Sequence, residues 1–176
     1  DVGARVFGGK VTLTGEMKTD AEPNPFKGEI RLNGASFKQF VKAYSPGMET
    51  EGDLTGDFAF SGVMNQWEKL EGKGAAIIVN GNLYAIPIIG PLTPLLSALF
   101  PSPIKGYNVA KEANCTYAVK NGVITTDNLE AFTTTFKIVS KGTINFIKDD
   151  ILFGAQVRVR GLPGIVLRPV SELLEY

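Results

Sequence analysis

The sequence contains no histidine and only one cysteine, Cys115, among its 176 residues. The absence of histidine excludes Ser-His-Asp and Cys-His catalysis, haem binding through histidine and the usual histidine-containing zinc sites. A single cysteine can form neither an intramolecular disulfide nor a multi-cysteine metal site. We therefore expect no metal and no cofactor in this chain.

A net charge is also lacking, because 18 acidic residues balance 18 basic ones. Surfaces that bind nucleic acid depend on clustered lysine and arginine, so a nucleic-acid partner is not expected. The chain begins with Asp1 rather than methionine, and no charged-then-apolar leader follows. We interpret residues 1–176 as one domain-scale segment excised from a longer chain, with any targeting signal outside it.

The longest uncharged stretch, Gly74–Ile104, does not predict a membrane span. A spanning helix needs about 20 continuous apolar residues, whereas this stretch is interrupted by Asn80-Gly81-Asn82 and by five prolines. The pattern instead predicts a buried strand, Ala75–Pro87, followed by an apolar helical cap. Outside this stretch, Trp67 is expected to anchor a loop.

The feature that dominates the sequence is alternation of apolar and polar residues with a period of two. It runs through residues 10–17, 26–32, 54–61, 115–119, 136–146 and 151–159. This period places successive side chains on opposite faces of a strand, and it predicts an antiparallel sheet with one apolar and one polar face. Asn121-Gly122 predicts a hairpin turn. Glycines within many strands indicate bends, so the sheet is expected to be strongly curved.

Three short helices are predicted to interrupt the sheet. Ser36 and Gln39 form a capping box for the first, and the apolar residues that follow are spaced for one helical face. The second begins at Thr93 with a proline in its first helical position, and the third begins near Pro169. The predicted fold is therefore mainly β: a strongly curved antiparallel sheet with three short helices.

Five short motifs carry a resemblance to a known family. They are Gly-Asp-Leu-Thr-Gly at 52–56, Leu-Glu-Gly-Lys-Gly at 70–74, Asn-Gly-Asn-Leu at 80–83, Ile-Pro-Ile-Ile-Gly-Pro-Leu at 86–92 and Asn-Gly-Val-Ile-Thr-Thr-Asp-Asn-Leu at 121–129. In this order they resemble the C-terminal region of the AsmA-like family of bacterial envelope proteins, over roughly residues 26–176. The resemblance implies a sheet that forms a hydrophobic groove in the periplasm. It also implies an inner-membrane anchor outside this chain and a role in moving phospholipid toward the outer membrane, or in outer-membrane homeostasis.

The apolar strand faces supply the candidate ligand contacts. On sequence alone a closed sandwich core is the more ordinary interpretation, but three short helices are few to cover so many strands. The candidate groove residues are Val11, Leu13, Ile30, Leu32, Phe58, Phe60, Ile78, Tyr117, Val119, Ile138, Ile144, Phe153 and Val157. The candidate cap residues, which would form a groove lid, a membrane-interface element or an interior plug, are Leu92, Leu95, Leu96, Leu99 and Phe100.

No group of residues predicts an active site. Ser140 and Lys141 are adjacent, but neighbouring strand residues point to opposite faces. Asp53 and Asp57 could bind a cation, although turn and edge positions explain such aspartates more simply. We therefore expect a protein that is not an enzyme and whose partner is a phospholipid or another acyl-chain ligand. Unpaired sheet edges predict self-association. The alternative is a structural or adhesive β-rich envelope domain without lipid cargo.

Overall fold

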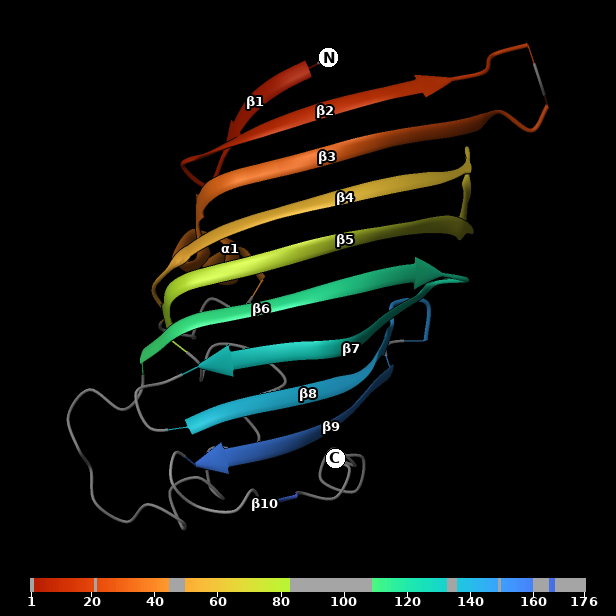
Figure 1. The fold of residues 1–176 in the computed structure, drawn as a ribbon. Coiled ribbons are helices and arrows are strands. Elements are labelled where there is room, and N and C mark those ends of the chain that lie inside the picture. Colours follow the sequence, from red (N-terminus) through yellow and green to blue (C-terminus); the bar gives the residue numbers. More distant parts are fainter. Residues whose placement is uncertain are drawn as a thin grey trace.

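The protein is described by a computed structural model over residues 2–20, 22–44, 50–82, 109–132, 136–148, 150–159 and 165–166. Within these residues, ten strands form one open sheet, in which the spatial order of the strands is their order in the chain (Figure 1). All neighbouring strands pair antiparallel. The elements are β1 (Val2–Val6), β2 (Gly9–Met17), β3 (Pro25–Ser36), α1 (Phe37–Tyr44), β4 (Asp53–Val63), β5 (Gln66–Asn82), β6 (Val109–Lys120), β7 (Val123–Phe132), β8 (Phe136–Asn145), β9 (Asp150–Val159) and β10 (Ile165–Val166). The mainly β, antiparallel prediction is confirmed.

The alternating segments of the sequence form strands, as predicted. Residues 10–17, 26–32, 54–61, 115–119 and 151–159 lie in β2, β3, β4, β6 and β9 respectively. The segment 136–146 forms β8, except that Phe146 lies in the turn that follows. Asn121 and Gly122 connect β6 to β7 with φ angles of 52° and 74°. Positive φ at both central residues is what a two-residue hairpin turn requires.

The register aligns the alternation of one strand with that of the next. Leu13 pairs with Ile30, which pairs with Phe58 on the following strand. Because paired residues of antiparallel strands project from the same face, the apolar residues of successive strands form one continuous apolar face. The residues between them form a polar face, on which Glu16 pairs with Lys27.

The sheet is not strongly curved, so this part of the prediction is wrong. Figure 1 shows long, gently bowed strands rather than a tightly curled sheet. The glycines that suggested bends instead make room for aromatic rings. A Cβ atom added to Gly72 would lie 2.6 Å from the ring of Phe58, and one added to Gly28 would lie 2.9 Å from the ring of Phe60.

The described residues contain one helix, α1, rather than the three that were predicted. Ser36 caps it as expected, because its Oγ accepts a hydrogen bond from the backbone N–H of Gln39 at 3.3 Å. Phe40 packs edge-on against Phe7 of the β1–β2 turn, with ring centroids 5.8 Å apart. The helices predicted from Thr93 and near Pro169 lie outside the described residues. Within the described part of the chain, no helix is long and apolar enough to cross a membrane.

Burial differs between the two halves of the apolar face. On β8 and β9, Ile138, Phe153 and Val157 are buried, whereas Leu13 and Ile30 of β2 and β3 are exposed. The strand predicted as buried over Ala75–Pro87 lies in β5 as far as Asn82, and residues 83–87 fall outside the described residues. The prediction of burial is wrong for Ile77 and Val79, because both are exposed on the polar face. The apolar face is therefore accessible at Leu13 and Ile30 on the N-terminal half of the sheet, and also at Ile151 of β9, which pairs with Ile144.

Candidate functional site

The candidate site is the apolar face of the sheet. The strand register places every predicted groove residue on this one face: Val11, Leu13, Ile30, Leu32, Phe58, Phe60, Ile78, Tyr117, Val119, Ile138, Ile144, Phe153 and Val157. The sequence therefore predicted which side chains share a surface. Their contact with a ligand stays a prediction. The predicted cap residues Leu92, Leu95, Leu96, Leu99 and Phe100 lie outside the described residues.

Four aromatic rings form a row across β3, β4 and β6 on this face. The ring centroids of Phe26 and Phe60 are 6.1 Å apart, those of Phe60 and Phe58 are 5.6 Å apart, and those of Phe58 and Tyr117 are 5.8 Å apart. The last two pairs are stacked, with 24° between their planes. Stacked and edge-on arrangements at these distances are the favoured geometries of aromatic pairs. The row is therefore a cohesive apolar strip.

The rings of this row lie over glycines of neighbouring strands. Phe26 covers Gly62, where an added Cβ would lie 2.7 Å from the ring, and Tyr117 covers Gly74, where it would lie 2.6 Å from the ring. A ring can approach the backbone this closely only where the neighbour has no side chain. These rings therefore lie close to the backbone of the sheet. They cover the glycine positions with flat aromatic surface, which we call the aromatic floor.

An apolar cavity of about 350 Å³ lies at the end of this row, beside the β4–β5 turn. Its lining residues are Phe26, Ile30, Phe58, Phe60, Val63, Met64, Asn65, Trp67 and Leu70. Only three of these nine were candidates from the sequence. Phe26 belongs to the alternating segment 26–32 but was not among the candidate groove residues. Alternation does not place the residues nearer the turn, because the register shifts between β4 and β5 at Ser61 and Val63. The prediction that Trp67 anchors a loop is wrong, since 71% of its surface is exposed.

Tyr117 brings the one hydrogen-bonding group of the aromatic row. Its hydroxyl donates to the backbone carbonyl of Asp57 at 3.1 Å. Burial raises the pKa of Tyr117; the negative charge of Asp57 adds to this effect, as does the Cys115 thiolate once that thiol ionises in alkali. Burial also raises the pKa of the neighbouring Cys115 thiol, opposed in part by a hydrogen bond with the backbone of Ala76. Both side chains are therefore neutral at physiological pH, and this part of the apolar face carries no charge.

The raised pKa of Tyr117 predicts a loss of stability in alkali. The unfolded chain releases the phenol proton at about pH 10, before the folded chain does. The contribution of Tyr117 to stability is therefore complete below that pH and is lost as pH rises through the folded-state pKa. We expect the free energy of unfolding of the wild type to fall more steeply between pH 9 and pH 11 than that of Tyr117→Phe. Urea unfolding over this range measures it, and equal slopes would contradict the assignment.

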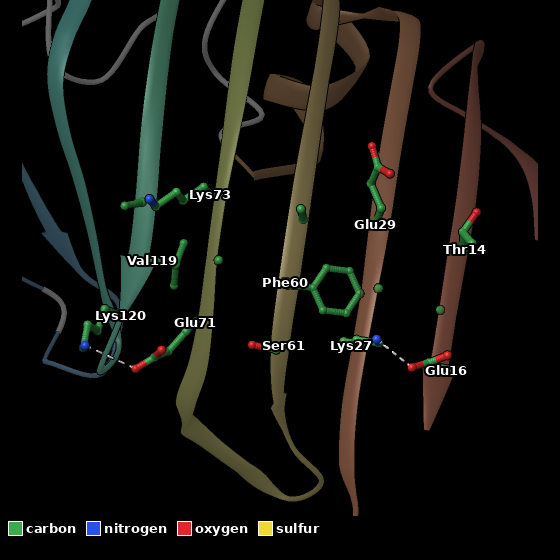
Figure 2. Close-up of a pocket in the computed structure, with 15 residues that line it drawn as sticks. Thr14, Glu16, Lys27, Glu29, Phe60, Ser61, Glu71, Lys73, Val119 and Lys120 are labelled. Atoms are coloured by element: carbon green, nitrogen blue, oxygen red, sulfur yellow. Dashed lines mark ion pairs between the residues drawn. The ribbon is translucent and has the colours of Figure 1, made fainter. Parts of the chain in front are cut away.

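The polar face differs in chemistry from the apolar one. It has a broad trough of about 880 Å³ over β2 to β6, floored by small residues such as Ala59 and Ala118. Figure 2 shows ion pairs on both sides of this trough, Lys27–Glu16 at 2.8 Å and Lys120–Glu71 at 3.6 Å. Hydrogen bonding to Lys27 lowers the pKa of Glu16. Exposed pairs of this kind add little stability, so these ion pairs mark the chemistry of the polar face and contribute little to holding the sheet together.

The candidate catalytic groups do not assemble into a site. Ser140 is buried on the apolar face, and its Oγ has no hydrogen-bond partner. Lys141 projects from the opposite face, so the two side chains do not pair. Among the described residues, no three metal-ligating side chains lie close enough together to hold an ion.

Comparison of the chain with protein-family models, with curated proteins and with solved structures finds no match. The resemblance to AsmA-like proteins over residues 26–176 therefore stays a prediction. Three of its motifs lie wholly within the described residues, and the one at 121–129 forms the β6–β7 turn and the start of β7. Gly-Asp-Leu-Thr-Gly leads into β4, and Leu-Glu-Gly-Lys-Gly places Gly72 and Gly74 within β5 beneath aromatic rings.

Proposed function

We propose that this chain is a non-catalytic lipid-handling module that binds phospholipid acyl chains on its apolar face. It would act in the periplasm, held to the inner membrane by a segment outside this chain, in phospholipid transport between the two membranes or in outer-membrane homeostasis. The observation that carries the proposal is the placement of all thirteen candidate residues on one face of an open sheet. The family resemblance supplies the cellular setting.

The exposed part of this face offers apolar surface that an acyl chain could bury with a gain in free energy. Leu13, Met17 and Ile30 are exposed large hydrophobic residues on adjacent strands. Contiguous apolar surface on a soluble protein marks a site of interaction. Each methylene group that an acyl chain buries there contributes about 0.8 kcal/mol. The free energy gained by burying several methylene groups against these residues would therefore exceed the entropy lost when one acyl chain is ordered.

The aromatic floor supports a passive mechanism. The rings over Gly62, Gly72 and Gly74 occupy the space that side chains at these positions would fill. An acyl chain in contact with such a floor meets similar apolar surface at each step, so it can slide without crossing a high barrier. The headgroup would stay in water beyond the sheet, where its charges keep their hydration.

A paired substitution tests acyl-chain binding. Ile30→Asp places a carboxylate on the apolar face, and Ile77→Asp places one at a similarly exposed position of the polar face; the wild-type side chains are 37% and 43% exposed. We expect Ile30→Asp to weaken binding of a fluorescent phospholipid at least tenfold, a loss of about 1.4 kcal/mol. Ile77→Asp should bind as the wild type does. Titration of delipidated protein with the labelled lipid measures both affinities.

Three results would contradict lipid binding. The first is wild-type protein that is free of lipid in native mass spectrometry and takes up no fluorescent phospholipid after delipidation. The second is uptake that Ile30→Asp and Ile77→Asp reduce equally, which would place the lipid elsewhere. The third is equal, undiminished uptake by both folded variants.

The second candidate function is a structural or adhesive β-rich envelope domain. The burial of Ile138 and Val157 on β8 and β9 favours it, because a face that is already covered has no room for a ligand. The two functions make different predictions for β2 and β3, where the apolar residues are exposed: lipid binds there in the first, and no lipid binds there in the second. Lipid-free wild-type protein that takes up no labelled phospholipid would therefore support the structural role.

A further inference from the structure

The sequential strand order gathers four turns at one end of the sheet. The β2–β3, β4–β5, β6–β7 and β8–β9 connections all lie there, at the right in Figure 1. We call this end the turn end and define it as the described residues in and beside these turns: 17–20, 22–24, 64–67, 121–122 and 146–148. The cavity lined by Met64 and Trp67 opens at the same end.

The turn end exposes large apolar side chains on separate turns and on the strand residues beside them. The exposed residues are Met17, Met64, Trp67, Phe146 and Ile147. Hairpin turns are ordinarily built from glycine, asparagine and other polar residues, so apolar side chains on two different turns are not explained by turn chemistry. With strands about 4.8 Å apart, the β4–β5 and β8–β9 turns are separated by about 19 Å. The exposed groups thus form a line along the end of the sheet.

The charges beside these side chains are mixed in sign. Lys18 is followed by Asp20 and Glu22, and Glu68 is followed by Lys69. A surface with adjacent positive and negative groups complements zwitterionic headgroups, which carry both charges, and has no net attraction for an anionic surface. Trp67 belongs to a residue type that is enriched at membrane interfaces, because the ring of tryptophan is apolar while its N–H can stay hydrated.

We propose that the turn end docks on a phospholipid bilayer with zwitterionic headgroups, inserting Met64 of the β4–β5 turn with Trp67 of β5 beside it, and Phe146 and Ile147 of the β8–β9 turn, into the interfacial layer. Docking of this kind does not require the apolar face to carry lipid. Transfer of an acyl chain from the bilayer into the cavity beside Trp67 would follow from docking, and this step rests on the proposed function.

Trp67 is the only tryptophan in the sequence, so intrinsic tryptophan fluorescence reports on this turn alone. We expect phosphatidylcholine vesicles to shift Trp67 emission to shorter wavelength. Lipids brominated near the headgroup should quench this emission more strongly than lipids brominated near the chain ends. Emission that vesicles leave unchanged, or quenching strongest at the chain ends, would overturn interfacial docking. This measurement uses the wild-type chain and is independent of any variant's folding.

A matched pair of variants tests the residues. Met64→Asp should reduce the vesicle partition coefficient at least tenfold. Ile77→Asp, which changes a side chain of equal exposure (43% against 44%) away from the turn end, should leave it unchanged. Far-ultraviolet circular dichroism confirms that both variants fold. Equal partitioning of the two folded variants would overturn the assignment.

Salt and lipid charge separate insertion from electrostatic attachment. Partitioning into phosphatidylcholine should persist at high salt, and replacing half of the lipid by phosphatidylglycerol should change it less than threefold. Binding that needs the anionic lipid and is lost in salt would overturn the proposal. Failure of the proposed lipid binding can be told apart from failure of docking. If only lipid binding fails, Ile30→Asp and the wild type both dock on vesicles, and neither takes up labelled lipid.

Discussion

Val157→Asp is expected to lower the free energy of unfolding by several kcal/mol. The Val157 side chain is 0% exposed and lies on the apolar face of β9 beside Ile138 of β8. An aspartate there would bury a carboxylate that has no partner, and such groups are among the most destabilising in proteins. The effect is expected whether the face binds lipid or forms a closed core. Urea unfolding of wild type and variant measures it.

Leu152→Asp is the matched control, because it introduces the same side chain on the same strand but on the polar face. Leu152 is 47% exposed, and its cross-strand partner is Thr143. A carboxylate at this position keeps its hydration, so we expect a loss of about 1 kcal/mol or less. Equal losses in the two variants would mean that the assignment of the faces on β9 is wrong.

Gly72→Ala is expected to destabilise the protein by about 1–3 kcal/mol, although it adds a single methyl group. The added Cβ would lie 2.5 Å from the carbonyl oxygen of Ala59 and 2.6 Å from the ring of Phe58. The carbonyl belongs to the β4 backbone and cannot move without disturbing the hydrogen bonds between β4 and β5. The Phe58 ring can move, but it would then leave its place in the aromatic row. Thermal or urea unfolding measures the loss.

Gly154→Ala should behave in the opposite way. An added Cβ at Gly154 meets nothing within 4 Å, and this glycine has no positive φ. Since alanine loses less backbone entropy than glycine on folding, we expect an unchanged or slightly higher stability, by up to about 1 kcal/mol. If the two alanine variants are equally stable, the rings do not lie over the glycines as described.

The strands and their faces could be predicted because period two is a local property of the chain. In β2, Val11 and Leu13 alternate with threonines, and this pattern alone decides which side chains share a face. Once β3 repeats the pattern, burial of apolar surface fixes the register, since a slip of one residue would exchange the two faces. The thirteen face residues follow from this reasoning without any knowledge of the fold.

The curvature and the cavity could not be predicted, because both depend on contacts between strands. Gly72 is an ordinary strand glycine in the sequence, and only the register shows that the Phe58 ring occupies its missing side-chain space. The register shift between Ser61 and Val63, which precedes the turn beside the cavity, is likewise visible only when the two strands are paired. A sequence pattern describes the faces of one strand, whereas these features arise where two strands meet.

The strictly sequential strand order has a consequence for how the molecule loses structure. Each strand from β2 to β9 contacts the strand before it and the strand after it in the chain, so stability is transmitted between nearest neighbours, as in repeat proteins. Fraying can then begin at β1, which is short and exposed, and stop at any later hairpin. Amide hydrogen exchange would slow progressively toward the interior strands. By the same reasoning, evolution can lengthen or shorten such a protein one hairpin at a time without reordering the rest.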